Sequence, residues 1–280
     1  MEVYVNGRFR PLDDPALPAR DRGFLSGEAV YESVKVAERR ALFLDSHLER
    51  LAASAGALGF EAGWGADELS PVLARLLDAA GLDDALARLY LTLGPAGDPP
   101  TRIVWVEPLP PHAAGDTAPW RLVRHPERLV PYRPDVKHTS RLAHALARRR
   151  AKAAGADDAL LLHADGWVLE GTASNVFFFE ADTLHTPETG CGVLPGITRD
   201  LVLELAPSCG FKTVEGRYPV EVLAAADEVF LTFTSAGVRP VASIDGRELA
   251  GGAPGPRTAR IGEAYEARVA ETLAHTPPLG

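Results

Sequence analysis

Three features in the second half of the chain could carry chemistry: a lysine, a glutamate and a pair of hydroxyl-rich segments. Lys137 lies at the end of an expected strand, just before an expected helix. A lysine amine whose pKa is lowered in a polar site can form a Schiff base with an aldehyde. Glu170 ends a strand of an expected hairpin, among Gly and Ser, where its carboxylate could keep a ring nitrogen protonated. Taken alone, each is more often an ordinary exposed residue.

The hydroxyl-rich segments could each bind an anion. Gly196-Ile197-Thr198 opens an expected helix, so backbone N–H groups and one hydroxyl point toward the same spot. Thr232, Thr234 and Ser235 form a second group in a loop after an expected strand. Each segment could also be a plain helix cap or loop. Together, however, an amine, a carboxylate and a phosphate cradle are what pyridoxal phosphate requires.

Other common catalytic signatures are missing from the sequence. It has no GxSxG, Walker A, GxGxxG or CxxC pattern, which removes support for serine hydrolases, P-loop enzymes and dinucleotide-binding enzymes. The 2 cysteines are too few for a disulfide framework, and the 8 histidines show no metal-binding spacing, so we expect no metal. Lysine is scarce, which leaves few candidates for any amine chemistry: Lys35, Lys137, Lys152 and Lys212.

Composition indicates a folded protein that avoids nucleic acid and membranes. The chain has 280 residues, 46% of them hydrophobic and 24% charged, which suits about two domains. The net charge of −9 disfavours binding to nucleic acid or to anionic membranes. We see no apolar run of about 18 residues and no apolar region typical of a signal peptide. We therefore expect a cytoplasmic protein.

Helical and strand-like patterns alternate along the whole sequence, so we expect an α/β (α+β) fold. Pro, Gly and Ala concentrate over residues 107–119. This predicts a smaller N-terminal α/β domain over 1–110, a linker over 111–119 and a larger C-terminal domain over 120–280. The apolar spacing and stop residues predict helices over residues 46–58, 66–80, 139–154, 198–209 and 258–274. Alternation and turn signals predict strands within residues 1–10 and over 29–36, 41–44, 86–93, 101–106, 121–124, 159–163, 167–169, 176–180, 183–186 and 228–233.

A series of ordered segments resembles the fold-type IV pyridoxal-phosphate enzymes. This family includes branched-chain aminotransferases, D-amino-acid aminotransferases and aminodeoxychorismate lyases. The similarity covers residues 1–270 and implies a two-domain fold whose C-terminal domain binds the cofactor. The segments are Asp21-Arg-Gly-Phe, Val30-Tyr-Glu-Ser-Val-Lys-Val, Asp45-Ser-His-Leu-Glu-Arg-Leu, Lys137-His-Thr-Ser-Arg, Gly155-Ala-Asp-Asp-Ala-Leu-Leu-Leu, Glu170-Gly-Thr-Ala-Ser-Asn-Val-Phe, Leu194-Pro-Gly-Ile-Thr-Arg and Ala226-Asp-Glu-Val-Phe.

The resemblance implies a role for individual residues. Lys137 matches the Schiff-base lysine, which also moves the proton between Cα and C4′. Glu170 matches the carboxylate on the pyridine nitrogen, and Arg50 matches the phosphate-binding arginine. The other matches are to phosphate donors, at Ile197, Thr198 and Thr234, and to an apolar residue packed near the ring, at Leu194.

Substrate-binding positions resemble more than one subgroup. Tyr31 matches a tyrosine that helps D-amino-acid aminotransferases to bind the substrate α-carboxylate. Those enzymes usually add an arginine and a histidine, where this chain has Leu93 and Pro95. Arg88 aligns with a strand arginine that contacts the substrate carboxylate in bacterial branched-chain enzymes.

The residues after the lysine are closer to the lyases. Lys137-His138-x-x-Arg141-Leu142 has leucine where branched-chain enzymes carry a tyrosine, and Arg141 could lean toward the cofactor or substrate from one helical turn away. The glutamate usual after the Thr-rich loop is replaced by Gly237.

The resemblance implies a pyridoxal 5′-phosphate-dependent transaminase that acts on D-amino acids with a 2-oxo acid acceptor, by a ping-pong mechanism. Two alternatives stay open, an aminodeoxychorismate lyase and then a branched-chain L-aminotransferase. Family members are homodimers, which we expect here too.

Overall fold

The computed structural model describes residues 1–14, 17–113, 115–249 and 254–280. Within these residues no helix combines the length and apolar character needed to cross a membrane. The chain divides into two compact units, each built from separate stretches of sequence. Unit 1 comprises Met1–Ala114, Val136–Ser140 and Val269–Gly280, and unit 2 comprises Gly115–Asp135 and Arg141–Arg268.

The boundaries of the two units differ from the domain limits expected from the sequence. Unit 2 begins at Gly115, inside the expected linker over 111–119. The segment Val136–Ser140, which contains Lys137, packs with unit 1. The division into domains over 1–110 and 120–280 stays a prediction.

Unit 1 contains an antiparallel sheet with strand order β2-β1-β6-β5-β3-β4. The first hairpin turns at Asn6 and Gly7, both at positive φ, as the expected Asn-Gly turn requires. The strands are β1 (Glu2–Val5), β2 (Arg8–Pro11), β3 (Ala29–Ala37), β4 (Arg40–Ala41), β5 (Ala85–Thr92) and β6 (Thr101–Glu107).

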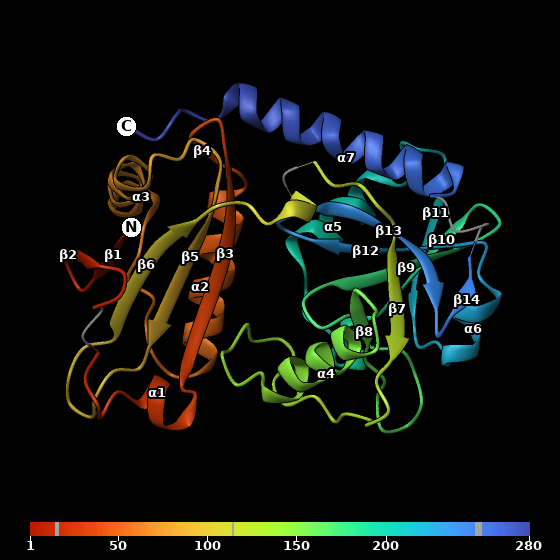
Figure 1. The fold of residues 1–280 in the computed structure, drawn as a ribbon, viewed down its shortest axis with the longest axis horizontal. Helices are drawn as coiled ribbons and strands as arrows, with labels where there is room; N and C mark the ends of the chain where they lie inside the picture. Colours follow the sequence, from red (N-terminus) through yellow and green to blue (C-terminus); the bar gives the residue numbers. More distant parts are fainter. Residues whose placement is uncertain (15–16, 114, 250–253) are drawn as a thin grey trace. The chain divides into compact units, whose positions relative to one another are not determined.

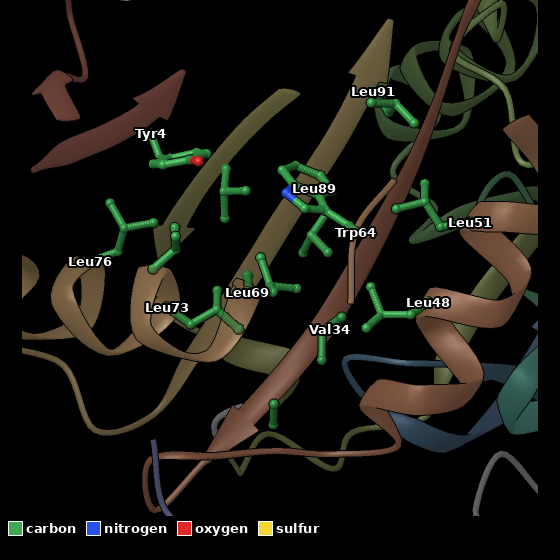
Figure 2. Packing of buried hydrophobic residues seen from close by; sticks show 14 of the residues in the cluster. Tyr4, Val34, Leu48, Leu51, Trp64, Leu69, Leu73, Leu76, Leu89 and Leu91 are labelled. Carbon is green, nitrogen blue, oxygen red and sulfur yellow. The ribbon is translucent and has the colours of Figure 1, made fainter. Parts of the chain in front are cut away.

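Two helices pack on one face of this sheet: α2 (Leu44–Ala57) and α3 (Ala66–Ala80) (Figure 1). Leucines at helical spacing meet the buried positions of the strands, and Figure 2 shows Leu69, Leu73 and Leu76 of α3 gathered against β5 and β6. The short helix α1 (Arg22–Ser26) is capped by the buried Asp21, which accepts hydrogen bonds from Gly23 N–H and two threonine hydroxyls.

Unit 2 contains a mixed sheet with strand order β11-β10-β9-β12-β13-β7-β8, and β14 pairs with β13. The pairs β10–β11, β13–β7 and β7–β8 are parallel. The strands are β7 (Trp120–Arg124), β8 (Asp158–Leu160), β9 (Asn175–Glu180), β10 (Thr183–Pro187), β11 (Lys212–Gly216), β12 (Glu228–Phe233), β13 (Gly237–Ile244) and β14 (Arg247–Glu248).

The two faces of this sheet carry separate apolar clusters. Phe177 and Phe179 of β9 pack with Phe230 of β12 on one side, where the rings of Phe177 and Phe230 stack at 5.1 Å. Phe178 packs on the other side, with Val229 and its neighbours. The helices are α4 (Leu142–Ala153), α5 (Ile197–Leu205), α6 (Val220–Ala225) and α7 (Pro256–His275), with short 3-10 turns at Pro111–Ala113 and Thr189–Cys191.

Some expected elements differ from the structure. The helix expected over 139–154 begins only at Leu142, since residues 137–139 are bonded to the start of β3. The strand expected over 167–169 forms isolated bridges instead of a ladder. The helix expected over 198–209 ends at Leu205, and the short strand expected over 41–44 is Arg40–Ala41.

Candidate active site

Lys137 is held in unit 1 beside the first residues of β3. Its backbone carbonyl accepts a hydrogen bond from Tyr31 N–H at 3.0 Å, and its own N–H donates to Ser54 Oγ of α2 at 3.2 Å. The Lys137 ammonium nitrogen lies 4.5 Å from the centre of the Tyr31 ring. This is within the range of a cation–π contact. The backbone on both sides of the lysine is therefore fixed, and its amine lies next to the phenol.

Arg50 of α2 is joined to Glu32 of β3 by a two-point ion pair. Arg50 Nε donates to Glu32 Oε1 at 2.7 Å, and Nη2 donates to Oε2 at 2.9 Å. His47, one helical turn before Arg50, has Nδ1 at 2.8 Å from the same Oε2. Glu32 and His47 are fully buried, and Arg50 is 12% exposed. The charged groups thus form one cluster on the side of the sheet covered by α2.

The protonation of this cluster follows from its contacts. Burial by itself raises the pKa of Glu32, but the hydrogen bond from His47 and the positive charge of Arg50 outweigh it and lower the pKa to about 2. Burial, followed by the charges of Arg50 and Lys137, lowers the pKa of His47 despite its bond to Glu32. His47 is therefore neutral, with Nδ1–H donating to an ionised Glu32. Its Nε2 is buried and has no hydrogen-bond partner among the described residues.

Tyr31 and Arg88 lie on the opposite face of the same sheet. The Tyr31 ring stacks on Tyr90 at 5.2 Å, and Tyr90 stacks on Trp105 at 5.0 Å. Arg88 donates from Nε and Nη2 to Glu107 Oε1 at 2.9 and 2.6 Å, and from Nη1 to the hydroxyl of Ser33 at 2.7 Å. The alternation of β3 accounts for this, because Tyr31 and Ser33 face one side and Glu32 the other.

Glu170 of unit 2 is held at one carboxylate oxygen by two donors. Its Oε2 accepts hydrogen bonds from Asn175 Nδ2 at 3.1 Å and from the Leu194 N–H at 3.2 Å. Asn175 also donates to the Leu194 carbonyl at 2.9 Å, which ties both residues together. Glu170 Oε1 has the ring of His144 at 3.9 Å. The side chain is 13% exposed, so this carboxylate is mostly shielded from water and fixed in orientation.

The start of α5 has no side-chain cap. Its N-cap is Gly196, which has no side chain to cap the helix, and a Cβ there would lie 2.1 Å from Asn175 Oδ1. The helix N-terminus at Ile197 and Thr198 therefore offers its backbone N–H groups to a ligand. Thr198 is buried and shares a side-chain hydrogen bond with Tyr265 of α7.

The loop after β12 supplies further hydroxyls. Thr234 lies in the turn that follows Phe233 and is half-buried. The hydroxyl of Thr232, on β12 itself, is buried and has no hydrogen-bond partner among the described residues. Buried hydroxyls are nearly always paired, so such a group is suited to a ligand.

Arg141 lies outside the helix in which the sequence suggested it. It is the N-cap of α4, and its guanidinium donates to the carbonyl of Thr172 in the loop after Glu170. The expected placement one helical turn after Lys137 is wrong, because residues 137–140 are not helical.

The structure groups the expected residues by unit. Lys137 and Tyr31 are neighbours in unit 1, and Glu170 and Leu194 are neighbours in unit 2. The sequence analysis did not identify the residues that are grouped with Arg50, namely Glu32 and His47. Glu32 had a signal, since it is the charged residue at a buried position between Val30 and Val34.

Comparisons with known proteins identify the family. The sequence profile described as "Amino-transferase class IV" matches residues 29–244. A putative branched-chain-amino-acid aminotransferase of Methanocaldococcus jannaschii is 33% identical, over 95% of this chain and 96% of its own length. A D-alanine aminotransferase of Bacillus licheniformis is 32% identical, over 99% of this chain and 100% of its own. The chain belongs to the class IV aminotransferases.

A solved structure extends this result to fold and cofactor. The crystal structure of a T.th. branched-chain amino acid aminotransferase with pyridoxamine 5′-phosphate superposes with a TM-score of 0.88 at 27% identity, covering 100% of this chain and 98% of that one. The fold expected from the sequence is confirmed, and the protein is a pyridoxal-phosphate-dependent transaminase. The donors described above fit this cofactor: the uncapped helix start and the orphaned Thr232 hydroxyl suit a phosphate, and the Glu170 carboxylate suits a ring N–H.

Proposed function

We propose that this class IV aminotransferase moves the amino group of a D-amino acid to a 2-oxo acid by a ping-pong mechanism. The observation that carries the proposal is the state of Arg88, whose three guanidinium nitrogens donate to Glu107 and Ser33. Three of its five N–H groups are thereby engaged within the protein, which disfavours the role that a branched-chain enzyme would give Arg88, binding of the substrate carboxylate. Tyr31, beside the Lys137 amine, is left to bind that carboxylate.

The chain's own residues divide the chemistry. Bound pyridoxal phosphate supplies the carbonyl carbon that takes the amino group and a ring that delocalises the electrons left on Cα. Lys137 binds the cofactor and then, as a free amine, moves the proton between the substrate Cα and C4′. The Glu170 carboxylate, held by Asn175, keeps the proton on the ring nitrogen.

The remaining residues hold the cofactor in place. Arg50 binds the phosphate with a planar guanidinium, which suits phosphate geometry. The N–H groups of Ile197 and Thr198 and the hydroxyl of Thr234 add neutral donors. Leu194 packs against the ring and also fixes Glu170 through its backbone N–H.

A branched-chain L-aminotransferase is the second candidate. The relative from Methanocaldococcus jannaschii supports it, since its identity to this chain is slightly higher than that of the D-alanine enzyme. This alternative requires Arg88 to bind the substrate carboxylate with its two further N–H groups or to leave Glu107 when substrate binds.

One spectroscopic experiment separates the candidates. The holoenzyme is mixed in turn with D-alanine, D-glutamate, L-leucine and aminodeoxychorismate, and its visible absorption is recorded. Conversion to the pyridoxamine form by a D-amino acid alone supports the proposal, and conversion by L-leucine alone overturns it in favour of the second candidate. Release of pyruvate from aminodeoxychorismate without a 2-oxo acid acceptor would identify a lyase.

We also propose that the enzyme is a homodimer, as the resemblance implies. Light scattering coupled to size-exclusion chromatography measures this directly, and the monomer mass is 29.9 kDa. A species of that mass at working concentrations would reject the dimer. The expected cytoplasmic location stays a prediction.

A further inference from the structure

Asp158, the first residue of β8, carries a buried carboxylate to which the proposed function gives no role. The residue is 2% exposed, and burial raises the pKa of its carboxyl. Removing a carboxylate from water is costly unless hydrogen bonds compensate. Three such bonds are present, each from an uncharged donor: Ala159 N–H, Thr172 N–H and Thr172 O–H.

Two of these bonds hold a single residue of the loop after Glu170. The Thr172 hydroxyl donates to Asp158 Oδ1, and the Thr172 N–H donates to Oδ2 at 3.1 Å. The Thr172 carbonyl accepts from Arg141, as described above. Both polar backbone groups and the side chain of Thr172 are therefore engaged, and Asp158 provides most of that restraint.

The turn between Glu170 and Ser174 transmits this restraint over a short distance. Gly171 N–H donates to the Ser174 carbonyl at 2.8 Å. A Cβ on Gly171 would lie 2.2 Å from Ser174 Oγ and 3.1 Å from Asp158 Oδ2, so the turn fits tightly around a bare backbone. The Glu170 carbonyl accepts from Leu161 N–H at 2.8 Å, just beyond β8. Residues 158–161 thus bond to the turn at Glu170 and at Thr172.

We propose that Asp158 is a positioning residue that sets the location of the Glu170 carboxylate. By fixing Thr172 it fixes the path of the turn, and with it the side chain that meets the cofactor's ring nitrogen. This inference rests on the role proposed for Glu170. It adds a residue that touches neither cofactor nor substrate and acts only through the turn.

Asp158→Asn is the sharpest test because it removes the negative charge and replaces one carboxylate oxygen with an NH2 group, while the size of the side chain stays the same. A carboxamide puts an N–H group where Asp158 has an oxygen, so in either orientation it meets a backbone N–H, that of Ala159 or that of Thr172. The dissociation constant of pyridoxal phosphate is measured by titrating the apoprotein. We expect this dissociation constant to rise about tenfold, a change that corresponds to the free energy of one hydrogen bond to a charged group. The pH dependence of the bound cofactor's absorption should shift as well, since Glu170 controls the ring nitrogen.

Asp157→Asn is the matched control. Asp157 is the preceding residue, and its carboxylate accepts from Arg121 N–H at 2.8 Å without touching Thr172. It undergoes the same chemical change at the same end of β8. We expect a lower melting temperature with unchanged cofactor affinity and absorption. Equal effects of the two substitutions on affinity, or an unchanged affinity in Asp158→Asn, would overturn the inference.

A second variant keeps the test valid if Asp158→Asn does not fold. Thr172→Val removes only the hydroxyl bond and should shift affinity and spectrum in the same direction, by a smaller factor. In the double variant the two effects should not add, because both substitutions weaken the bonding between the side chain at position 158 and residue 172. Additive effects would contradict the proposal.

Failure of the inference is distinguishable from failure of the Glu170 assignment. Glu170→Gln should alter the absorption of the bound cofactor. If it does and Asp158→Asn does not, only the positioning role is wrong. If Glu170→Gln leaves the absorption unchanged, the assignment of Glu170 is wrong, and the positioning role falls with it.

Discussion

Glu32 and Arg50 connect β3 to α2 through two parallel hydrogen bonds, Nε to Oε1 at 2.7 Å and Nη2 to Oε2 at 2.9 Å. Glu32 occupies a position of β3 whose neighbours on the same face, Val30 and Val34, are fully buried. A lone carboxylate at this position would be strongly destabilising. The ion pair makes it tolerable and fixes the guanidinium proposed to bind phosphate before any ligand arrives.

Replacing Glu32 by glutamine should destabilise the apoprotein by roughly 3–5 kcal/mol at neutral pH, the usual result of removing one partner of a buried ion pair. Because the pKa of Glu32 is lowered to about 2, its contribution is complete above the unfolded value near 4.5 and is lost as the pH falls from there toward 2. Urea unfolding at a series of pH values measures both effects. A Glu32→Gln protein as acid-sensitive as the wild type would contradict this.

His47 should remain neutral well below the pH at which an exposed histidine takes up a proton. Burial lowers its pKa from the ordinary value near 6.5, so the unfolded chain binds the proton first. Stability from this group is present above about pH 6.5 and declines as the pH falls below it. Histidine ring shifts in NMR spectra report the titration directly. A His47 ring that takes up its proton at the same pH in the folded and in the urea-unfolded protein would refute the prediction.

Lys137→Ala should reduce transamination at least about 10²–10⁴-fold, because it removes the general acid–base group. The wild-type protein treated with borohydride and digested should carry the cofactor on the peptide that contains Lys137. Lys35→Ala, on the sheet that carries Tyr31, serves as the comparison and should keep both activity and label. Label found on another lysine would reject the assignment of Lys137.

Tyr31→Phe should raise the KM for a D-amino acid about tenfold while kcat changes little, since it removes one hydrogen bond to the substrate carboxylate. Tyr90→Phe removes the hydroxyl of the neighbouring ring in the same stack and should leave the KM unchanged. Steady-state kinetics on both variants decide the matter. A fall in kcat with unchanged KM in Tyr31→Phe would mean that the phenol does not bind the carboxylate.

Gly237→Ala should destabilise the protein by about 1–3 kcal/mol more than Gly246→Ala does. Both glycines have positive φ, +65° and +77°, so both substitutions carry the same backbone strain. At Gly237 the new Cβ would meet the Tyr265 ring at 2.3 Å, whereas at Gly246 no described residue would lie within 4 Å of it. Differential scanning calorimetry measures the stability of both variants. Equal losses of stability would show that Tyr265 moves aside freely.

Local sequence patterns predicted much of the fold. The helix over 66–80 matches α3 at both ends because apolar spacing and Gly81 define it without tertiary help. The strand β13 was missed, since it contains Pro240 and begins at Gly237, and both residues argue against a regular strand. The helix α6 has only six residues, too few for a periodic signal.

Less of the candidate site could be predicted from the sequence, because its residue pairs are distant in the chain. Individual residues such as Lys137 and Glu170 could be named from motifs. Glu32 and Asp158, which hold other residues of the candidate site in place, lie far away in sequence from the residues that they bond, 18 positions from Arg50 and 14 from Thr172. Such pairs arise only from strand register and helix packing, which one sequence does not reveal.

The five-residue stretch Val136–Ser140 belongs to unit 1, although the residues on either side belong to unit 2. A gene fragment that starts after the 111–119 segment would therefore encode Lys137 without β3, the strand to which it is bonded. During synthesis the lysine leaves the ribosome long after β3 and is fixed only when it returns there. Splitting the protein at that segment would therefore separate Lys137 from the strand that holds its backbone in place.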